Sequence, residues 1–147
     1  MGKMEELSMS VYRTLVGILV AAIAIMAGAG ALLAGEAPSA AKQSVAGGGV
    51  TVVVTRLEDA AGGPAFHVVL DTHSANLDGY RFEEIVQLRD GKGGEVAPAA
   101  VEGAKGSGHH REATVRFAWP DPRPANLQVA VKGVAGVSER EFRWPLQ

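Results

Sequence analysis

Residues 50–57 read VTVVVTRL, and residues 65–72 read AFHVVLDT. β-Branched side chains dominate the first run, and glycines or a Gly-Gly-Pro turn border it on each side. In the second run Phe66, Val68 and Leu70 recur at every second position, which places them on one face of an extended strand. Both runs therefore predict short β-strands separated by turns.

The remainder of the polar body repeats this pattern of short strands and turns. Further strands are predicted at residues 80–88, 95–97, 112–119, 126–132 and 137–144. Residues 80–85 are the place where a helical turn would fit instead of a strand. The run WPDPRP at residues 119–124 is predicted to be a connection, because its prolines lack the N–H group that a strand ladder needs.

About seven short strands in roughly one hundred residues predict an all-β fold, an immunoglobulin-like β-sandwich, with a small barrel as the alternative. The core is expected from the apolar face of each strand. His67 lies on the opposite face of its strand and is expected to be half-exposed. The predicted core residues are Phe66, Val68, Leu70, Phe82, Val86, Val115, Phe117, Trp119, Leu127, Val129, Val131, Phe142 and Trp144.

The N-terminal part of the chain has a different character. Residues 14–35 read TLVGILVAAIAIMAGAGALLAG and carry no charge. A helix of this length would span about 33 Å, which is enough for the hydrocarbon core of a bilayer. The segment therefore predicts a single transmembrane helix that is retained as a signal anchor. Cleavage near Ser39-Ala40-Ala41, where small residues suit a signal peptidase, is the alternative.

These features divide the chain into four regions. Residues 1–13 form a short head, 14–35 the membrane segment, 36–49 a flexible linker rich in Gly, Ala and Ser, and 50–147 the β-domain. Lys3 and Arg13 precede the membrane segment, so the positive-inside rule weakly favours a cytoplasmic N-terminus. The prediction is a single-pass protein of the cell membrane with its C-terminal domain outside the cytoplasm.

Composition excludes several classes of function. The chain has 14 Lys and Arg against 16 Asp and Glu, so it lacks the basic surface that nucleic acid or an anionic membrane surface would attract. It has no cysteine, which rules out disulfides, thiolate metal ligands and a thiol nucleophile. No Gly-x-Ser-x-Gly motif or phosphate-binding glycine loop is present, so an enzyme is the less favoured class.

Two histidine-bearing segments offer a candidate metal site. Asp71 and His73 lie at the end of one predicted strand, and His109 and His110 lie just before another. Asp71 and His73 share one side of an extended chain, and imidazole is a ligand for copper(II) and zinc. If the loops meet, Asp71, His73 and one of the tandem histidines would bind copper or zinc. The competing interpretation is that these side chains make structural hydrogen bonds.

Three motifs together resemble a family of uncharacterised prokaryotic proteins with an N-terminal membrane segment and a small β-rich domain. They are F-x-V-x-x-D-T-H-S at residues 66–74, G-x-G-H-H-R at 106–111 and E-R-x-F-x-W at 139–144. The resemblance covers about residues 50–147 and brings no established activity. It implies that the Thr-His-Ser and His-His-Arg segments belong to one site or to one structural lock.

The leading functional hypothesis is therefore a membrane-anchored extracytoplasmic binding or accessory domain, with a protein partner in an envelope or membrane complex. The alternative is a copper- or zinc-handling module that uses His73 with His109 or His110.

Overall fold

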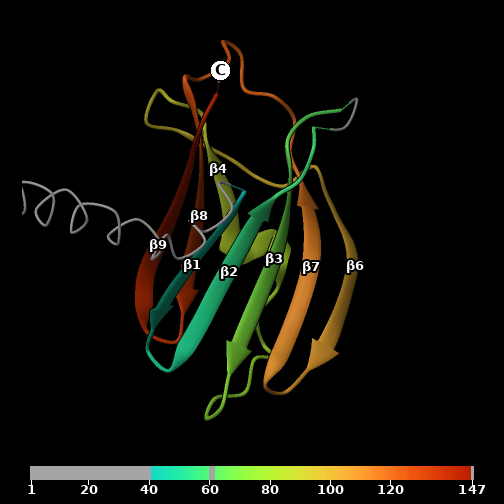
Figure 1. Cartoon of the computed structure of the whole chain (residues 1–147), viewed down its shortest axis with the longest axis vertical. Helices are drawn as coiled ribbons and strands as arrows, with labels where there is room; N and C mark the ends of the chain where they lie inside the picture. Colours follow the sequence, from blue (N-terminus) through green and yellow to red (C-terminus); the bar gives the residue numbers. More distant parts are fainter. Residues whose placement is uncertain (1–40, 60–61, 147) are drawn as a thin grey trace, which may run out of the picture. The chain divides into compact units, whose positions relative to one another are not determined.

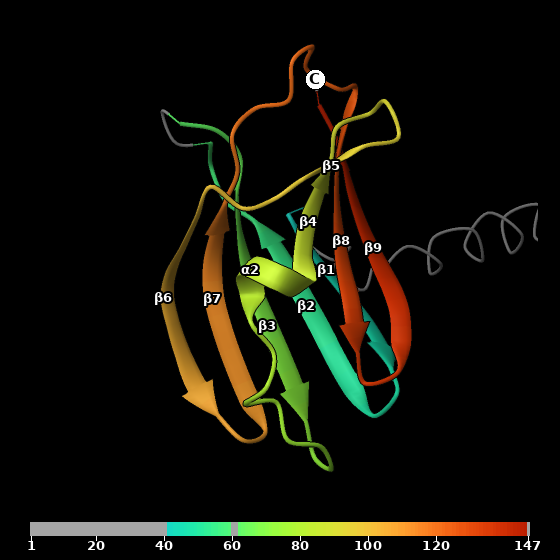
Figure 2. The same ribbon diagram turned by 180° about the vertical axis from the view of Figure 1, so that it is seen from behind.

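The computed structural model describes residues 41–59 and 62–146, which form an all-β fold of two sheets (Figure 1; Figure 2 shows the opposite side). The larger sheet has the order β1 (Lys42–Gly47), β2 (Val50–Arg56), β3 (Ala65–Thr72), β7 (His110–Arg116) and β6 (Ala100–Ser107). The smaller sheet has the order β5 (Glu95–Val96), β4 (Val86–Arg89), β8 (Asn126–Val134) and β9 (Val137–Pro145). Every neighbouring pair of strands is antiparallel. The strands form two separate sheets in a sandwich-like arrangement, and not the closed barrel that was the alternative prediction.

The core lies between the two sheets and contains all but one of the predicted core residues, together with others that were not predicted, among them Val50, Val52 and Val54 of β2. Alternate residues of β2, β3 and β7 meet alternate residues of β8 and β9, as period-two burial requires. Phe66 contacts both the ring of Phe117, at 6.0 Å between centroids, and that of Trp144, at 5.2 Å. All predicted core residues are buried except Trp119, which is only partly buried because β7 ends at Arg116.

The predicted linker over residues 36–49 is wrong for its described part, residues 41–49. Lys42–Gly47 forms β1, which pairs with β2 along its whole length. Gly48 and Gly49 have φ values of 62° and 80° and form the tight turn between the two strands. A Cβ on Gly48 would lie 2.1 Å from the carbonyl oxygen of Ala135, so only glycine fits there.

Strand β1 also joins the edges of the two sheets. The side-chain amide of Gln43 donates to the carbonyl of Arg143 at 2.6 Å and accepts from its N–H at 3.1 Å. The indole N–H of Trp144 donates to the carbonyl of Ala41 at 3.1 Å. The folded domain therefore begins before residue 50, where the sequence had placed its boundary.

Two further elements differ from the predicted strands. Residues 82–85 form the single helical turn α2 (Phe82–Ile85), so the helical alternative for residues 80–85 is correct and only β4 follows as strand. Strand β6 was not predicted, because at the edge of the sheet its residues are mostly exposed and show no apolar alternation. Ion pairs from Glu102 to Arg116 and from Lys105 to Glu112 hold it to β7.

The head, the membrane segment and the first part of the linker lie outside the described residues. Among the residues that the structure describes, no helix has the length and apolar character needed to cross a bilayer. The transmembrane helix at residues 14–35 therefore stays a prediction.

The strands place two sets of connections at opposite ends of the domain. We call one the hairpin end; it comprises the turns at residues 48–49, 108–109 and 135–136 with segment 73–81. We call the other the pocket end; it comprises the connections at 57–64, 90–94 and 117–125, without residues 60 and 61. In Figure 1 the pocket end is uppermost and the hairpin end lies below.

Candidate functional site

The residues of the predicted metal site all lie at the hairpin end. Asp71 near the end of β3 faces His110 at the start of β7 in the strand register, and Asp71 Oδ2 lies 3.7 Å from His110 Nδ1. Both side chains are about half exposed, at 53% and 52%. His73 is exposed on the segment that follows β3. The structure therefore brings Asp71 and His110 together as a solvent-exposed pair.

His109 is used within the fold. Its Nδ1 lies 2.9 Å from the carbonyl oxygen of Ala75, and its own carbonyl accepts a hydrogen bond from the N–H of Thr72 at 2.9 Å. Across residues 41–59 and 62–146, no three His, Asp or Glu side chains gather closely enough to hold a metal ion. The competing structural interpretation therefore describes the contacts of His109.

Thr72 organises the chain at the end of β3. Its side chain is buried, with 4% of the residue exposed, and its hydroxyl donates to the carbonyl of Gly49 at 2.7 Å. The same oxygen accepts from the N–H groups of Ser74 and Ala75, at 3.2 and 3.3 Å. The Thr72 hydroxyl therefore links the β1–β2 turn to segment 73–81, which is a role that a threonine side chain can perform at this position.

Arg111 completes the connection between the two histidine segments. Its guanidinium donates to the carbonyls of Leu77 and Asp78, each at 3.2 Å, and to that of Tyr80. The N–H of Leu77 donates to Gly108 at 2.8 Å, and the N–H of Gly108 donates to the carboxylate of Asp78 at 2.8 Å. We call this set of bonds the segment lock. It shows that the Thr-His-Ser and His-His-Arg segments form one hydrogen-bonded unit.

Arg140 is a second polar residue at the hairpin end, and its side chain is buried. Arg140 of β9 is 2% exposed, and it donates to the carbonyls of Val134 and Gly47, at 3.0 and 2.6 Å. Its Nε has no partner among the described residues, and burial lowers the pKa of its guanidinium. Arg140 shares the inward strand face of Phe142 and Trp144, so its position two residues before Phe142 was the signal available in the sequence.

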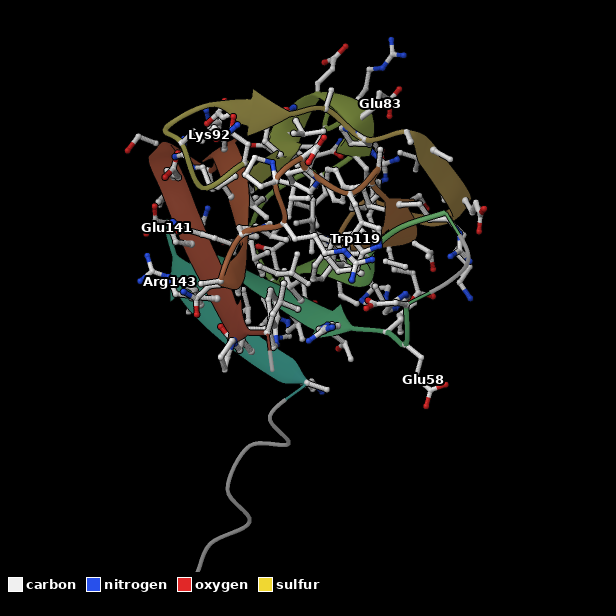
Figure 3. All side chains as sticks on the ribbon, turned by 90° about the horizontal axis from the view of Figure 1, so that it is seen from above. Glu58, Glu83, Lys92, Trp119, Glu141 and Arg143 are labelled. Atoms are coloured by element: carbon white, nitrogen blue, oxygen red, sulfur yellow. The ribbon has the colours of Figure 1, made fainter. Side chains whose placement is uncertain are left out.

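The open concave site lies at the pocket end. A pocket of about 600 Å³ forms where β2 ends, β9 ends and the proline-rich connection passes between them. Figure 3 looks onto this end and shows Trp119 between the two sheets, whereas Glu58 points outward from its loop. The lining residues are Arg56, Asp59, Trp119, Arg123, Pro124, Ala125, Pro145 and Leu146.

The pocket combines cationic, acidic and aromatic groups. The guanidinium of Arg123 stacks over the ring of Trp119 with 4.0 Å from its central carbon to the ring centroid. Arg56 donates to the carboxylate of Asp59 at 3.3 Å. Arg123 is exposed, and among the described residues its guanidinium has no hydrogen-bond acceptor or carboxylate partner, so its N–H groups are open to solvent beside the pocket. Such groups are suited to a phosphate or a carboxylate.

Sequence reasoning missed this pocket for a definable reason. It placed Trp119 in the core and treated residues 119–124 only as a connection between strands. The pocket is assembled from residues far apart in the chain, from Arg56 to Leu146, and only the sheet topology brings them together. The one local signal was a tryptophan followed by alternating prolines, a stretch that leaves the ladder at the end of the sandwich.

No protein-family model matches the chain, and neither the curated proteins nor the solved structures yield a match. The fold and the site define an all-β domain with a polar and aromatic pocket at one end. Its function is therefore argued from the geometry of that pocket.

Proposed function

We propose that this chain is a membrane-anchored extracytoplasmic binding domain, and that the pocket between Arg56, Trp119 and Arg123 is its ligand site. The uncharged run at residues 14–35 serves as the single anchor, with the N-terminus in the cytoplasm. The observation that carries the proposal is a concave pocket at one end of the sandwich, lined by Trp119 and by the exposed Arg123, whose guanidinium has no acceptor among the described residues. Binding domains commonly place their ligand sites on the connections at a sandwich end.

We further propose that the sandwich is of the immunoglobulin-like type. The order β2-β3-β7-β6 corresponds to the A-B-E-D sheet of that fold. The order β4-β8-β9 corresponds to its C-F-G sheet, with β5 as an additional edge strand. In this assignment β1 is an extra N-terminal strand. The connection at residues 117–125, which carries Trp119 and Arg123, then links strands E and F.

The orientation is tested with the full-length chain, tagged at its C-terminus, in spheroplasts treated with external protease. The proposal predicts digestion of the β-domain and protection of a tag placed at the N-terminus instead. Protection of the β-domain would contradict the proposed topology. The mass of the membrane-bound product separates a retained anchor from cleavage near residues 39–41.

The copper- or zinc-handling module is the second candidate, and the Asp71–His110 pair is the contact that favours it. Titration of the full-length chain with copper(II) and zinc tests it directly. The triple variant His73→Ala, His109→Ala, His110→Ala is the matched control. Equal affinity of the two proteins would remove this candidate, and a loss of affinity in the variant would support it.

A further inference from the structure

The described chain begins at the same end of the domain as the pocket. The carbonyl of Ala41 accepts hydrogen bonds from the backbone N–H of Arg56, at 2.7 Å, and from the indole of Trp144, at 3.1 Å. The side chain of Arg56 lines the pocket. The point at which the β-domain joins the preceding sequence is therefore next to the pocket and not at the hairpin end.

The length of the preceding sequence limits how far the pocket end can lie from the proposed anchor. Five residues, 36–40, separate the uncharged run from Ala41. Fully extended, the six steps from residue 35 to residue 41 cover about 20 Å at most. If residues 14–35 span the bilayer, Ala41 therefore stays close to the lipid headgroups.

The pocket has the chemistry of a membrane interface. Tryptophan is enriched at the level of the headgroups, where its ring meets both apolar and wet surroundings. Trp119 is partly buried here, and Pro124, Pro145 and Leu146 supply apolar walls beside it. The unpaired donors of Arg123 match the geometry of a phosphate group.

The charges at the pocket end narrow the choice of lipid. Two guanidinium groups and the carboxylate of Asp59 line the pocket itself. The surrounding connections add Glu58, Asp90, Asp121 and Lys92, so this end lacks the excess of positive charge that binds an anionic membrane surface. The pattern suits a single zwitterionic headgroup, whose phosphate contacts the arginines and whose ammonium group lies toward Asp59.

From this juxtaposition we infer that the pocket binds the headgroup of a zwitterionic phospholipid in the membrane that anchors the chain. The phosphate accepts hydrogen bonds from Arg123 and Arg56, and the glycerol end lies along Trp119 and Leu146. This inference rests on the proposed function, since it requires the anchor at residues 14–35. It adds a ligand class to that function.

The test uses the full-length chain in vesicles of phosphatidylethanolamine and phosphatidylcholine with brominated acyl chains, which quench nearby tryptophan. The chain has two tryptophans, so the emission that disappears in Trp119→Phe is assigned to Trp119. We expect brominated lipid to quench this emission strongly. Arg123→Gln should weaken the quenching, whereas Arg143→Gln, which removes an exposed charge of β9 outside the pocket, should leave it unchanged.

A second experiment with soluble ligands distinguishes binding of a lipid headgroup from binding of free phosphate. Glycerophosphoethanolamine should bind the wild-type chain, and about tenfold more weakly after Arg123→Gln, as expected when one charged hydrogen bond is lost. Inorganic phosphate should compete poorly. Equal binding of inorganic phosphate, or quenching only when anionic phosphatidylglycerol is present, would overturn the inference.

Carbonate extraction of the membranes distinguishes failure of the lipid inference from failure of the proposed function. If carbonate extraction shows the chain to be anchored but Trp119 is not quenched, the lipid inference is wrong and the proposed function stands. If the chain is released by carbonate, the proposed anchor itself is wrong.

Discussion

The two ends of the domain use their polar residues in opposite ways. At the hairpin end Thr72, Arg111 and Arg140 direct their hydrogen bonds to backbone carbonyls of the fold itself. At the pocket end Arg123 stacks on Trp119 and leaves its N–H groups without an acceptor in the described chain. Similar residue types thus stabilise the fold at one end and line the proposed ligand site at the other.

This difference shows that a cluster of polar residues beside strand ends is not by itself a site. The His-His-Arg segment is distinctive in sequence because its backbone and side chains join two connections across the larger sheet. What distinguishes the pocket is a concave surface beside an exposed guanidinium, that of Arg123, which has no acceptor among the described residues. The predictions below test that contrast, beginning with the core that both ends share.

The largest expected effect comes from the shared core. Phe117 is 1% exposed and contacts Phe66, so Phe117→Ala should lower the free energy of unfolding by about 3–5 kcal/mol. His67 lies on the outer face, where Nε2 is 3.0 Å from Glu112, and His67→Ala should cost under about 1 kcal/mol. Urea unfolding of the full-length chain in detergent, followed by tryptophan emission, measures both. Equal losses would contradict the assignment of inner and outer faces.

A smaller effect contrasts the two ends directly. Arg111→Ala removes the donor of three carbonyls and should cost about 2–3 kcal/mol, because hydrogen bonds from charged groups are the stronger ones. Arg123→Ala should change stability by no more than about 0.5 kcal/mol, since its guanidinium holds no backbone group in place. The same urea experiment compares them. If Arg123→Ala lowered the free energy of unfolding more than Arg111→Ala, Arg123 would stabilise the fold more than Arg111 does, which would contradict the contrast between the two ends.

Acid should destabilise the domain through ion pairs on the sheet faces. The hydrogen bond from Lys132, followed by the charges of Lys132 and Arg89, lowers the pKa of Glu95 below its ordinary value of 4.5. A group with a lowered folded pKa contributes stability that is present above its unfolded pKa and is lost as the pH falls through the folded pKa.

The urea midpoint should therefore fall as the pH drops below about 4.5, and Glu95→Gln should make this fall smaller. Glu112 behaves in the same direction, because the hydrogen bond from Lys105 is the main cause that lowers its pKa. An unchanged acid response in Glu95→Gln would show that this carboxylate has no part in it.

Much of the fold was predictable because strands buried on one face carry a period-two pattern. That pattern located β2, β3, β7, β8 and β9 and more than half of the core, although the buried valines of β2 were not among the predicted core residues. It was absent from β1 and β6, which lie at the edges of the larger sheet and are stabilised by pairing and polar contacts. The glycine run at residues 47–49 suggested a tether, although two of its members form a turn that needs positive φ.

The functional residues were less predictable, for a physical reason. The sequence showed that the two histidine segments were unusual, and the structure shows them to be one lock. Whether a polar side chain is satisfied by the fold depends on contacts such as that between Arg111 and Tyr80, 31 positions apart. The pocket depends on even more distant contacts, from Arg56 to Leu146.

Hydrogen exchange of single amides tests the contrast between the ends most directly. The N–H groups of Thr72 and Leu77 donate within the segment lock, whereas those of Asp121 and Arg123 have no acceptor in the described chain. In the full-length chain, Thr72 and Leu77 should exchange slowly in both detergent and phosphatidylethanolamine nanodiscs. Asp121 and Arg123 should exchange fast in detergent and more slowly in the nanodiscs. Fast exchange at Thr72 and Leu77 in detergent, with protection gained there in nanodiscs, would contradict the account.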